Sequence, residues 1–245
     1  MQKTIGRGLI MRIILDRIKY SRETKKDILF DNPYSYGKVN INNEKCNGCS
    51  KCIGECIVGA ISIKDGKAII DHDKCIYCGN CTQICDKAAL EMVHDCKFCT
   101  LEQAGNELKQ KIYKKFKRSL VLRSVDTGSC NACMLELAAT QNTYYDISRF
   151  GVKFAASPRH SDGIVVTGPV TINMREALIK TYNAMPEPRL VIAVGACSLD
   201  GGIFKDGYGS VGKLGDIIPV DLYIPGCPPS PQAIVYGLLK LVDRI

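Results

Sequence analysis

The sequence lacks a long apolar run and contains few histidines. No stretch approaches the ~18 consecutive apolar residues that a membrane-spanning helix needs. A peripheral subunit of a membrane complex has no such stretch either, so a purely soluble location does not follow. We also expect no signal peptide. With three histidines, the chain can form few sites that combine cysteine and histidine ligands. The net charge is +8, but no nucleic-acid-binding motif accompanies it. We therefore expect no nucleic-acid partner.

Cysteine, by contrast, is abundant, with 14 residues in a chain of 245. In a secreted chain shorter than ~100 residues, this number would indicate a scaffold of disulfides. This chain is longer, and most of its cysteines fall into C-x2-C groups. We therefore predict metal binding in a reducing compartment.

Positive charge is concentrated in segments 1–26 and 109–118. Such segments attract anionic lipid or an acidic protein, or they are solvated faces. From Thr4 to Tyr20 apolar residues recur at helical spacing, which predicts a basic amphipathic helix within an N-terminal segment, residues 1–37. A helix of this kind lies on a membrane surface, docks on a partner or packs on its own domain, and the sequence leaves these three interpretations open.

Residues 38–93 contain an internal repeat with a period of 29 residues. Each copy carries the pattern C-x2-C-x2-C-x3-C. The first copy contains Cys46, Cys49, Cys52 and Cys56, and the second contains Cys75, Cys78, Cys81 and Cys85. Lys64 to Lys67 is predicted to form a hairpin turn. A module this small has little apolar core, so we expect its bound metal to hold it together.

The repeat resembles the two-cluster bacterial ferredoxins, which share this cysteine spacing. In that family the fourth cysteine of each run binds the other cluster. The resemblance implies one 4Fe–4S cluster on Cys46, Cys49, Cys52 and Cys85, and a second on Cys75, Cys78, Cys81 and Cys56. Ile57 and Asp86 stand where the family usually has proline, which removes no ligand. The alternative, a zinc ribbon, would leave four cysteines unused.

Cys96 and Cys99 form a further C-x2-C pair. Two thiols do not complete a tetrahedral site. A mixed zinc site, a ligand pair shared with another subunit, a redox dithiol and thiols without a metal role all remain open. We take the ferredoxin domain as residues 38–100. Residues 101–118 are predicted to form a charged helix that links it to a second domain, residues 119–245.

The second domain alternates short apolar runs with amphipathic segments. Strands are expected at 119–125, 163–167, 190–194 and 221–224, and helices at 132–141, 174–185 and 231–242. This alternation predicts an α/β doubly wound, flavodoxin-like parallel sheet. The last four cysteines to be assigned follow strands: Cys130, Cys133, Cys197 and Cys227. Sites in such sheets lie beyond the carboxyl ends of strands, so four thiolates could converge there on one cluster. A structural zinc would use the same thiolates.

Several loops of this domain resemble the small subunit of membrane-bound nickel–iron hydrogenases. They are Ser129–Glu136, Ser157–Asp162, Thr167–Thr171, Gly195–Cys197 with Gly201–Phe204, and Pro225–Pro231. The homologous cluster-bearing subunit of respiratory complex I shares most of these loops. That subunit usually has two adjacent cysteines in the first loop, whereas this chain has Cys130-x2-Cys133. The spacing favours the hydrogenase branch.

The resemblance implies a path for electrons. Soluble ferredoxin or another electron-donor subunit would reduce the two N-terminal clusters. A third 4Fe–4S cluster would pass the electrons to a nickel–iron large subunit that reduces protons to hydrogen. Glu136 is the candidate proton-transfer residue, and the alternative is a first-turn glutamate that stabilises the helix dipole. The expected location is peripheral, on the cytoplasmic face of the membrane, beside membrane ion-translocating subunits.

Two other functions remain compatible with the sequence. One is an electron-transfer subunit of a hydrogenase-derived or complex I-like oxidoreductase without a nickel site. The other is a free ferredoxin-like carrier with a structural C-terminal domain. The partner large subunit would distinguish a hydrogenase from an oxidoreductase without a nickel site, because only the partner of a hydrogenase has nickel-binding cysteines.

Overall fold

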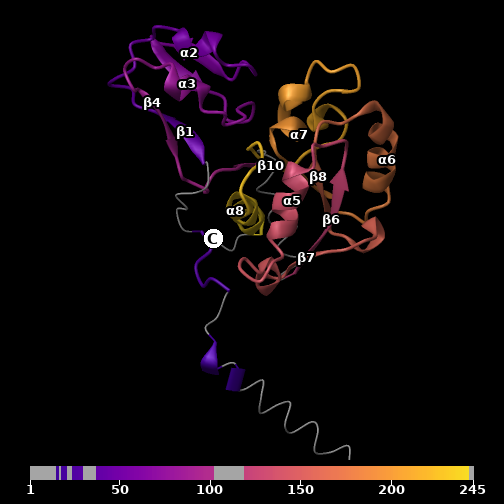
Figure 1. Ribbon diagram of the computed structural model, residues 1–245. Coiled ribbons are helices and arrows are strands. Elements are labelled where there is room, and N and C mark those ends of the chain that lie inside the picture. The colour runs from indigo at the N-terminus through magenta and orange to yellow at the C-terminus, as the bar shows by residue number, and fades with distance from the viewer. Residues whose placement is uncertain (1–14, 17, 21–23, 30–36, 102–118, 243–245) are drawn as a thin grey trace, which may run out of the picture.

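The computed structural model describes residues 15–16, 18–20, 24–29, 37–101 and 119–242. It forms a small cysteine-rich unit and a larger α/β unit that lie side by side (Figure 1). Residues 15–16 and 18–19 are helical, and most of the predicted amphipathic helix lies outside the described residues. Among the described residues, no helix has both the length and the apolar character needed to cross a membrane.

The small unit reproduces the duplication of its sequence. Strand β1 (Lys38–Ile41) pairs antiparallel with β4 (Leu90–Val93), and β2 (Ile61–Lys64) pairs antiparallel with β3 (Lys67–Ile70). One short helix lies within each cysteine run and carries its third cysteine: α2 (Lys51–Gly54) and α3 (Asn80–Gln83). The predicted hairpin turn is confirmed, because Asp65 and Gly66 join β2 to β3 with φ angles of 52° and 70°. Positive φ at both central residues is what a type I′ turn requires.

The large unit is a mixed sheet with the strand order β5-β10-β9-β8-β6-β7. Its strands are β5 (Thr100–Leu101), β6 (Leu120–Asp126), β7 (Val152–Phe154), β8 (Gly163–Thr167), β9 (Leu190–Val194) and β10 (Leu222–Ile224). Strands β6 to β10 are parallel. Counted along the chain, these five strands have the order 2-1-3-4-5, which is the flavodoxin-like arrangement. The predicted fold class is confirmed.

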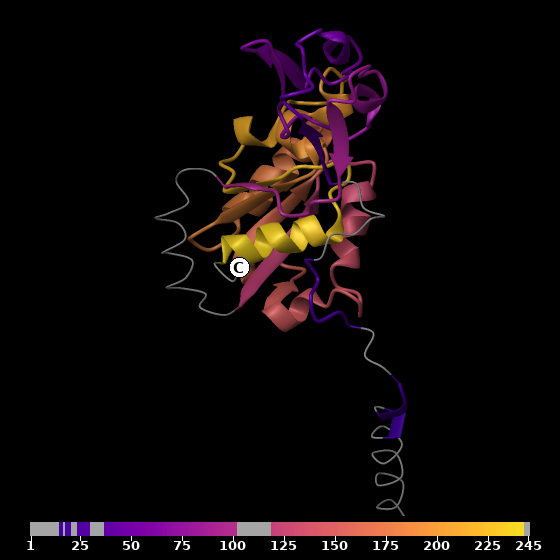
Figure 2. The same cartoon turned by 90° about the vertical axis from the view of Figure 1, so that its left-hand side faces the viewer.

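Helices cover both faces of this sheet (Figure 2). On one face α5 (Ala132–Ala139) and α8 (Pro231–Leu241) pack on a core that includes Leu137, Ile192 and Leu238. On the other face, α6 (Ile172–Asn183) and α7 (Ala196–Asp200) pack on a second core. Every residue of β8 and β9 is buried. Coverage of both faces explains why these strands are unbroken apolar runs in the sequence.

Three elements differ from the sequence prediction. Strand β7 and helix α7 were not predicted, because three and five residues are too few to show a period. The predicted linker helix does not begin at Leu101, which instead belongs to β5 and pairs antiparallel with Leu222 of β10. The rest of that predicted helix, residues 102–118, lies outside the described residues.

Part of the N-terminal segment lies on the large unit. Ile28 is buried in the core that contains α8. Its carbonyl accepts a hydrogen bond of 3.0 Å from Nε2 of Gln232. The backbone N–H of Lys25 donates to the carbonyl of Tyr144 over 3.2 Å. Residues 24–29 therefore pack on the α/β unit, ahead of the ferredoxin-type repeat.

Candidate cluster sites

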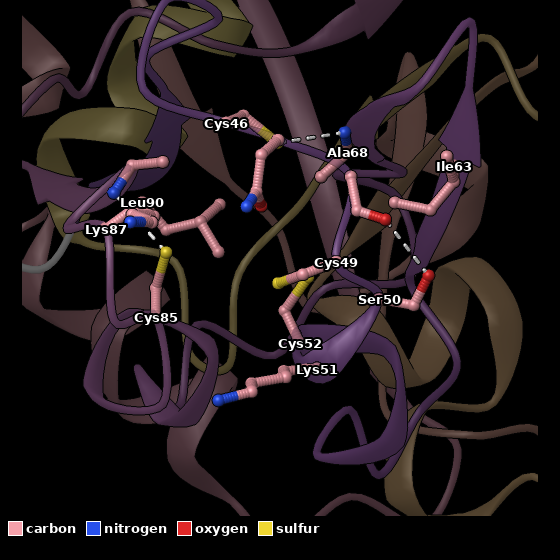
Figure 3. Close-up of a pocket in the computed structure, with 13 residues that line it drawn as sticks. Cys46, Cys49, Ser50, Lys51, Cys52, Ile63, Ala68, Cys85, Lys87 and Leu90 are labelled. Carbon is pink, nitrogen blue, oxygen red and sulfur yellow. Dashed lines mark hydrogen bonds between the residues drawn. The ribbon is translucent and has the colours of Figure 1, made fainter.

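Four cysteines surround one pocket of the small unit, which we call the outer pocket (Figure 3). They are Cys46, Cys49, Cys52 and Cys85. The backbone N–H of Ala68 lies 3.4 Å from Sγ of Cys46, and that of Ala89 lies 3.3 Å from Sγ of Cys85. Such bonds stabilise negative charge on sulfur. The Ala68 bond is the main reason why the pKa of Cys46 falls below its usual range.

Four other cysteines surround a second pocket, which we call the inner pocket. They are Cys56, Cys75, Cys78 and Cys81. The amide of Ala60 lies 3.2 Å from Sγ of Cys56, and that of Tyr77 lies 3.4 Å from Sγ of Cys75. Burial raises the pKa of Cys75 to about 12 and that of Cys81 to about 11. These thiols need the positive charge of bound iron to become thiolates near neutral pH.

The two pockets group the eight cysteines in a crossed manner. Cys85, from the second repeat, joins three cysteines of the first repeat, and Cys56 joins three cysteines of the second. This grouping is the one that the predicted ligand sets require, so the geometry supports those sets.

A third group of cysteines lies at the carboxyl edge of the parallel sheet. Cys130 and Cys133 follow β6, Cys197 lies in α7 directly after β9, and Cys227 follows β10. Two glycines allow the loops to approach one another. A Cβ atom on Gly195 would lie 2.5 Å from Sγ of Cys133, and one on Gly202 would lie 3.0 Å from Sγ of Cys197. Both glycines also have positive φ, 91° and 53°, a region that other residues rarely adopt.

The four sulfurs are close enough to influence one another's protonation. Burial is the main cause that raises the pKa of Cys133 to about 12, and charge on Cys197 and Cys227 adds to it. Burial likewise raises the pKa of Cys197 to about 11. Cys133 and Cys197 are buried, whereas Cys130 and Cys227 are exposed. A cluster held here would be covered by the domain on one side and would face outward on the other.

The spacing of the donor atoms bears on the zinc alternatives. In the part of the chain that the structure describes, no three His, Cys, Asp or Glu side chains are arranged to hold a single metal ion. A tetrahedral zinc draws its thiolates to about 2.3 Å from one point. A four-iron cluster holds its cysteines farther apart, each on a different iron atom. Sets made only of cysteine are the usual ligands of 4Fe–4S clusters.

Comparison with known proteins agrees with both units. Residues 130–241 match the family described as NADH ubiquinone oxidoreductase, 20 kDa subunit, and residues 45–90 match the 4Fe–4S dicluster domain. A probable membrane-bound hydrogenase subunit, mbhJ of Pyrococcus furiosus, is 44% identical over 121 residues, which are 49% of this chain and 72% of that protein. The chain belongs to the family of the 20 kDa subunit. With its dicluster domain, it is an electron-transfer subunit that carries 4Fe–4S clusters.

Other members of this family come from two kinds of oxidoreductase. Formate hydrogenlyase subunit 7 of Escherichia coli is 44% identical over 138 residues, covering 56% of this chain. The chain spans about half of that relative, 54% of its length. A subunit of the NADH-quinone oxidoreductase of Geotalea uraniireducens is 50% identical over 113 residues, covering 46% of this chain and 66% of that protein.

Glu136 lies beside the third group of cysteines, in α5. It is half-buried, and burial raises its pKa above the usual range of a carboxyl. Its charge acts in turn on Cys133. The alternative role that we considered, a glutamate that stabilises the helix dipole, does not fit, because α5 has no acidic residue in its first turn.

Cys96 and Cys99 lie near the elements of the large unit. Cys96 is buried and close enough to Tyr145 to influence its pKa. Cys99 packs against the core formed by α5 and α8. Neither cysteine lines the outer or the inner pocket. The pair therefore lies where the small unit meets the large one, and its four interpretations remain predictions.

A cleft of about 750 Å³ is lined by residues of both the small unit and the large unit. Asp71, Asp73 and Lys74 line it on one side, directly before Cys75 of the inner pocket. Leu199 and Asp200 line it on the other side, directly after Cys197. The cleft is spanned by a 3.4 Å hydrogen bond from Oγ1 of Thr100 to Asp73. The segment that precedes Cys75 of the inner pocket therefore borders the same cleft as α7, the helix that carries Cys197.

Proposed function

We propose that this chain relays electrons from reduced ferredoxin, through three 4Fe–4S clusters, to a nickel–iron site in a partner large subunit. The partner would reduce protons to hydrogen. One observation carries this proposal: three groups of four cysteines follow one another, and the loops of the second and third groups border the same cleft. Electron tunnelling slows steeply with distance, so a series of close sites serves to pass electrons between distant partners.

The residues of the chain would control each step through their surroundings. When bound, each cluster accepts and releases one electron. Cysteine thiolates hold the iron, and amides such as those of Ala60 and Ala89 donate to the cysteine sulfurs. Those bonds stabilise the more negative, reduced form and raise the reduction potential, whereas burial lowers it. The order of transfer that we propose is outer pocket, inner pocket, then the site of Cys130, Cys133, Cys197 and Cys227.

The edge that carries the third site is suited to a large partner. Cys130 and Cys227 are exposed there. Large apolar side chains on the loops that follow α7 are also exposed: Ile203 by 56%, Phe204 by 38%, Tyr208 fully and Val211 by 38%. The start of α6 adjoins them, since the N–H of Ile172 donates to the carbonyl of Gly209. Exposed apolar residues around an outward-facing site support a subunit interface there, and we assign it to the nickel–iron subunit.

The proposed location is peripheral, on the cytoplasmic face of a membrane and beside ion-translocating subunits. It rests on the Pyrococcus relative, whose name places it in a membrane-bound hydrogenase. In this arrangement the membrane subunits, not this chain, carry the ions.

We further propose that Glu136 transfers protons at the interface with the partner. A carboxyl whose pKa is raised by burial exchanges protons near neutral pH more readily than an ordinary one. Replacing Glu136 with Gln should lower hydrogen evolution by about 10²-fold, and Glu136→Asp should recover part of the loss. Reduction of all three clusters should be unchanged in both variants. Equal rates in the Gln variant and the native protein would exclude this role.

A second candidate function is electron transfer in a complex I-like oxidoreductase that has no nickel site. The 50% identity to the Geotalea relative, which belongs to a NADH-quinone oxidoreductase, favours it. The C-x2-C spacing of Cys130 and Cys133, which resembles the hydrogenase branch, favours the first proposal.

The deciding experiment is anaerobic purification of the intact complex through a tag on this chain, followed by metal analysis. We expect about 12 iron atoms per chain, from three four-iron clusters, and nickel in the large subunit. Hydrogen should form when reduced ferredoxin is added. A complex without nickel would favour the second candidate. About eight iron atoms together with zinc would contradict the third cluster.

A further inference from the structure

The two cluster pockets of the ferredoxin-type unit differ in charge. Lys51 and Lys87 line the outer pocket, and Figure 3 shows both beside the cysteines. A third lysine, Lys67, donates from Nζ to the carbonyl of Cys46 over 2.5 Å. Among the residues that the structure describes, the inner pocket is lined by Glu55 and by no lysine. The unit as a whole, residues 38–100, has eight lysines and eight carboxylates. The difference is therefore one of placement within a neutral unit.

The repeat shows that the lysines are not a requirement of the fold. With the period of 29 residues, Asn80 occupies the position of Lys51, and Val58 occupies that of Lys87. Glu55 corresponds to Ile84. Both copies form the same loop and helix around their cysteines. The two loops carry similar charge, but the crossed grouping of the cysteines brings Lys51 and Lys87 to the outer pocket and Glu55 to the inner pocket.

Each pocket has one exposed cysteine, Cys49 in the outer pocket and Cys78 in the inner one. At the outer pocket the two lining lysines, Lys51 and Lys87, are exposed as well. In Figure 1, α2, which contains Lys51, lies farther from the C-terminal sheet than α3 does. The loop of the inner pocket borders the cleft toward the third site instead.

We infer that the outer pocket is the docking site of a small acidic electron-carrier protein, held by the basic collar of Lys51, Lys67 and Lys87. Opposite charge steers a carrier to a site and orients it there, and this raises the association rate more than the affinity. In the productive complex one electron moves: the carrier is oxidised by one electron, and the cluster at the outer pocket is reduced by one. No bond forms or breaks.

Asp86 reduces the positive charge of the basic collar but does not neutralise it. Its carboxylate pairs with Nζ of Lys51, and this pairing raises the pKa of Lys51 further above neutral pH. Lys51 therefore stays charged, although part of its field is neutralised. Lys87 is exposed beside this pair, and we expect it to contribute most to steering.

The test measures how fast a reduced acidic two-cluster ferredoxin reduces the intact, anaerobically purified complex. At low ionic strength Lys87→Glu should lower the second-order rate about tenfold, and Lys87→Gln about threefold. In 0.5 M salt both differences should shrink to about twofold or less, because salt screens exposed charges. Two control variants should stay within about twofold of the native rate at every salt concentration. They are Lys153→Glu, an exposed charge reversal on β7, and Asn80→Glu, at the repeat-equivalent position of the inner pocket.

A second reductant distinguishes a variant that no longer docks the acidic carrier from a variant that no longer folds correctly. Reduced methyl viologen is a small cation, so a negative charge at position 87 should leave its rate unchanged or increase it. A slower reaction with both reductants would indicate damage to the cluster and would overturn the inference. So would equal slowing by Lys153→Glu, or a salt-independent effect.

This inference rests on the proposed function, but the two fail differently. If the purified complex lacked iron at the outer pocket, no reductant would reduce it, and the proposed relay itself would be wrong. If viologen reduced all clusters and the acidic carrier reacted equally with native protein and Lys87→Glu, only the docking site would be wrong.

Discussion

The ferredoxin-type unit and the C-terminal unit hold cysteine sites in opposite ways. In the first, cysteines are part of the core itself: Cys52 and Cys81 are among its eight buried core residues, and four more cysteines pack against them. In the second, two apolar cores cover the faces of the sheet, and among the described residues Cys133 is the one site cysteine in either core. The small unit is thus built around its clusters, whereas the large unit has a core of its own beneath its site.

The small unit is therefore expected to fold only when its clusters are bound. The large unit is expected to fold whether or not a cluster is bound. A small unit without much apolar surface to bury gains its stability from metal ligation. A doubly wound sheet with fully buried strands gains it from the hydrophobic effect. The same metal chemistry therefore has two structural consequences within one chain.

Removal of all iron should have the largest effect on the difference in stability between the two units. The small unit should unfold, and the large unit should stay folded. After anaerobic oxidation and chelation, backbone amides of β2 and β3 should lose their protection from hydrogen exchange. Amides of β8 and β9 should keep theirs, because their strands are buried on both faces. Exchange measured by mass spectrometry before and after chelation would show this. Loss of protection in both units would contradict it.

Single ligand replacements should show the same contrast on a smaller scale. Cys197→Ser should lower the iron content from about 12 to about eight atoms per chain and abolish hydrogen evolution, while two ferredoxin-type signals persist in electron paramagnetic resonance. Cys81→Ser, a matched replacement of a buried ligand in the inner pocket, should instead destabilise the whole small unit. Retained hydrogen evolution in Cys197→Ser would show that the third site is not the last step.

A core replacement in the large unit should affect stability without affecting the ferredoxin-type clusters. Ile164 is fully buried in β8. Ile164→Ala should lower the free energy of unfolding of the C-terminal unit by about 2–5 kcal/mol. Ile69→Ala, in the exposed face of β3, is the matched control and should cost far less. Denaturant unfolding, followed with the iron–sulfur absorbance, would separate the two units. If Ile164→Ala shifted the unfolding midpoint of the iron–sulfur absorbance as much as that of the parallel sheet, the two units would unfold together.

The smallest effect should come from the bond across the cleft. Thr100→Val removes the hydroxyl that donates to Asp73, a bond of 3.4 Å at an exposed position. We expect a change of about 0.5 kcal/mol or less in the free energy of unfolding. Thr100→Ser keeps the hydroxyl and should match the native protein. A cost well above 1 kcal/mol in thermal unfolding would show that the cleft couples the units more tightly than this bond suggests.

The sequence predicted the structure best where a single physical cause produces both the residue pattern and the element that it forms. Coverage of both faces makes β8 and β9 unbroken apolar runs, and their predicted bounds agree with the structure. The duplication with its fixed cysteine spacing predicted the paired pockets, and a positive-φ turn at Asp65 and Gly66 marked the hairpin. These signals are local or strictly periodic.

The features that the sequence did not reveal depend on contacts between distant segments. The cleft between the segment before Cys75 and α7 arises from the packing of two units, for which no local pattern exists. Gly195 appeared only as a loop glycine, and its close approach to Cys133 needs the sheet to be assembled first. The charged segment after Cys99 suggested a helix at Leu101, but pairing with β10 overrides that local preference.

Strand β5 has a consequence for any attempt to divide this chain. It comes from the ferredoxin side of the sequence, yet it pairs with β10, which is otherwise the edge of the parallel sheet. An uncovered edge presents free N–H and C=O groups on which another chain can pair and aggregate. A fragment beginning at Ser119 would keep its core but lose this protective strand. The smaller unit thus shields the larger one from self-association.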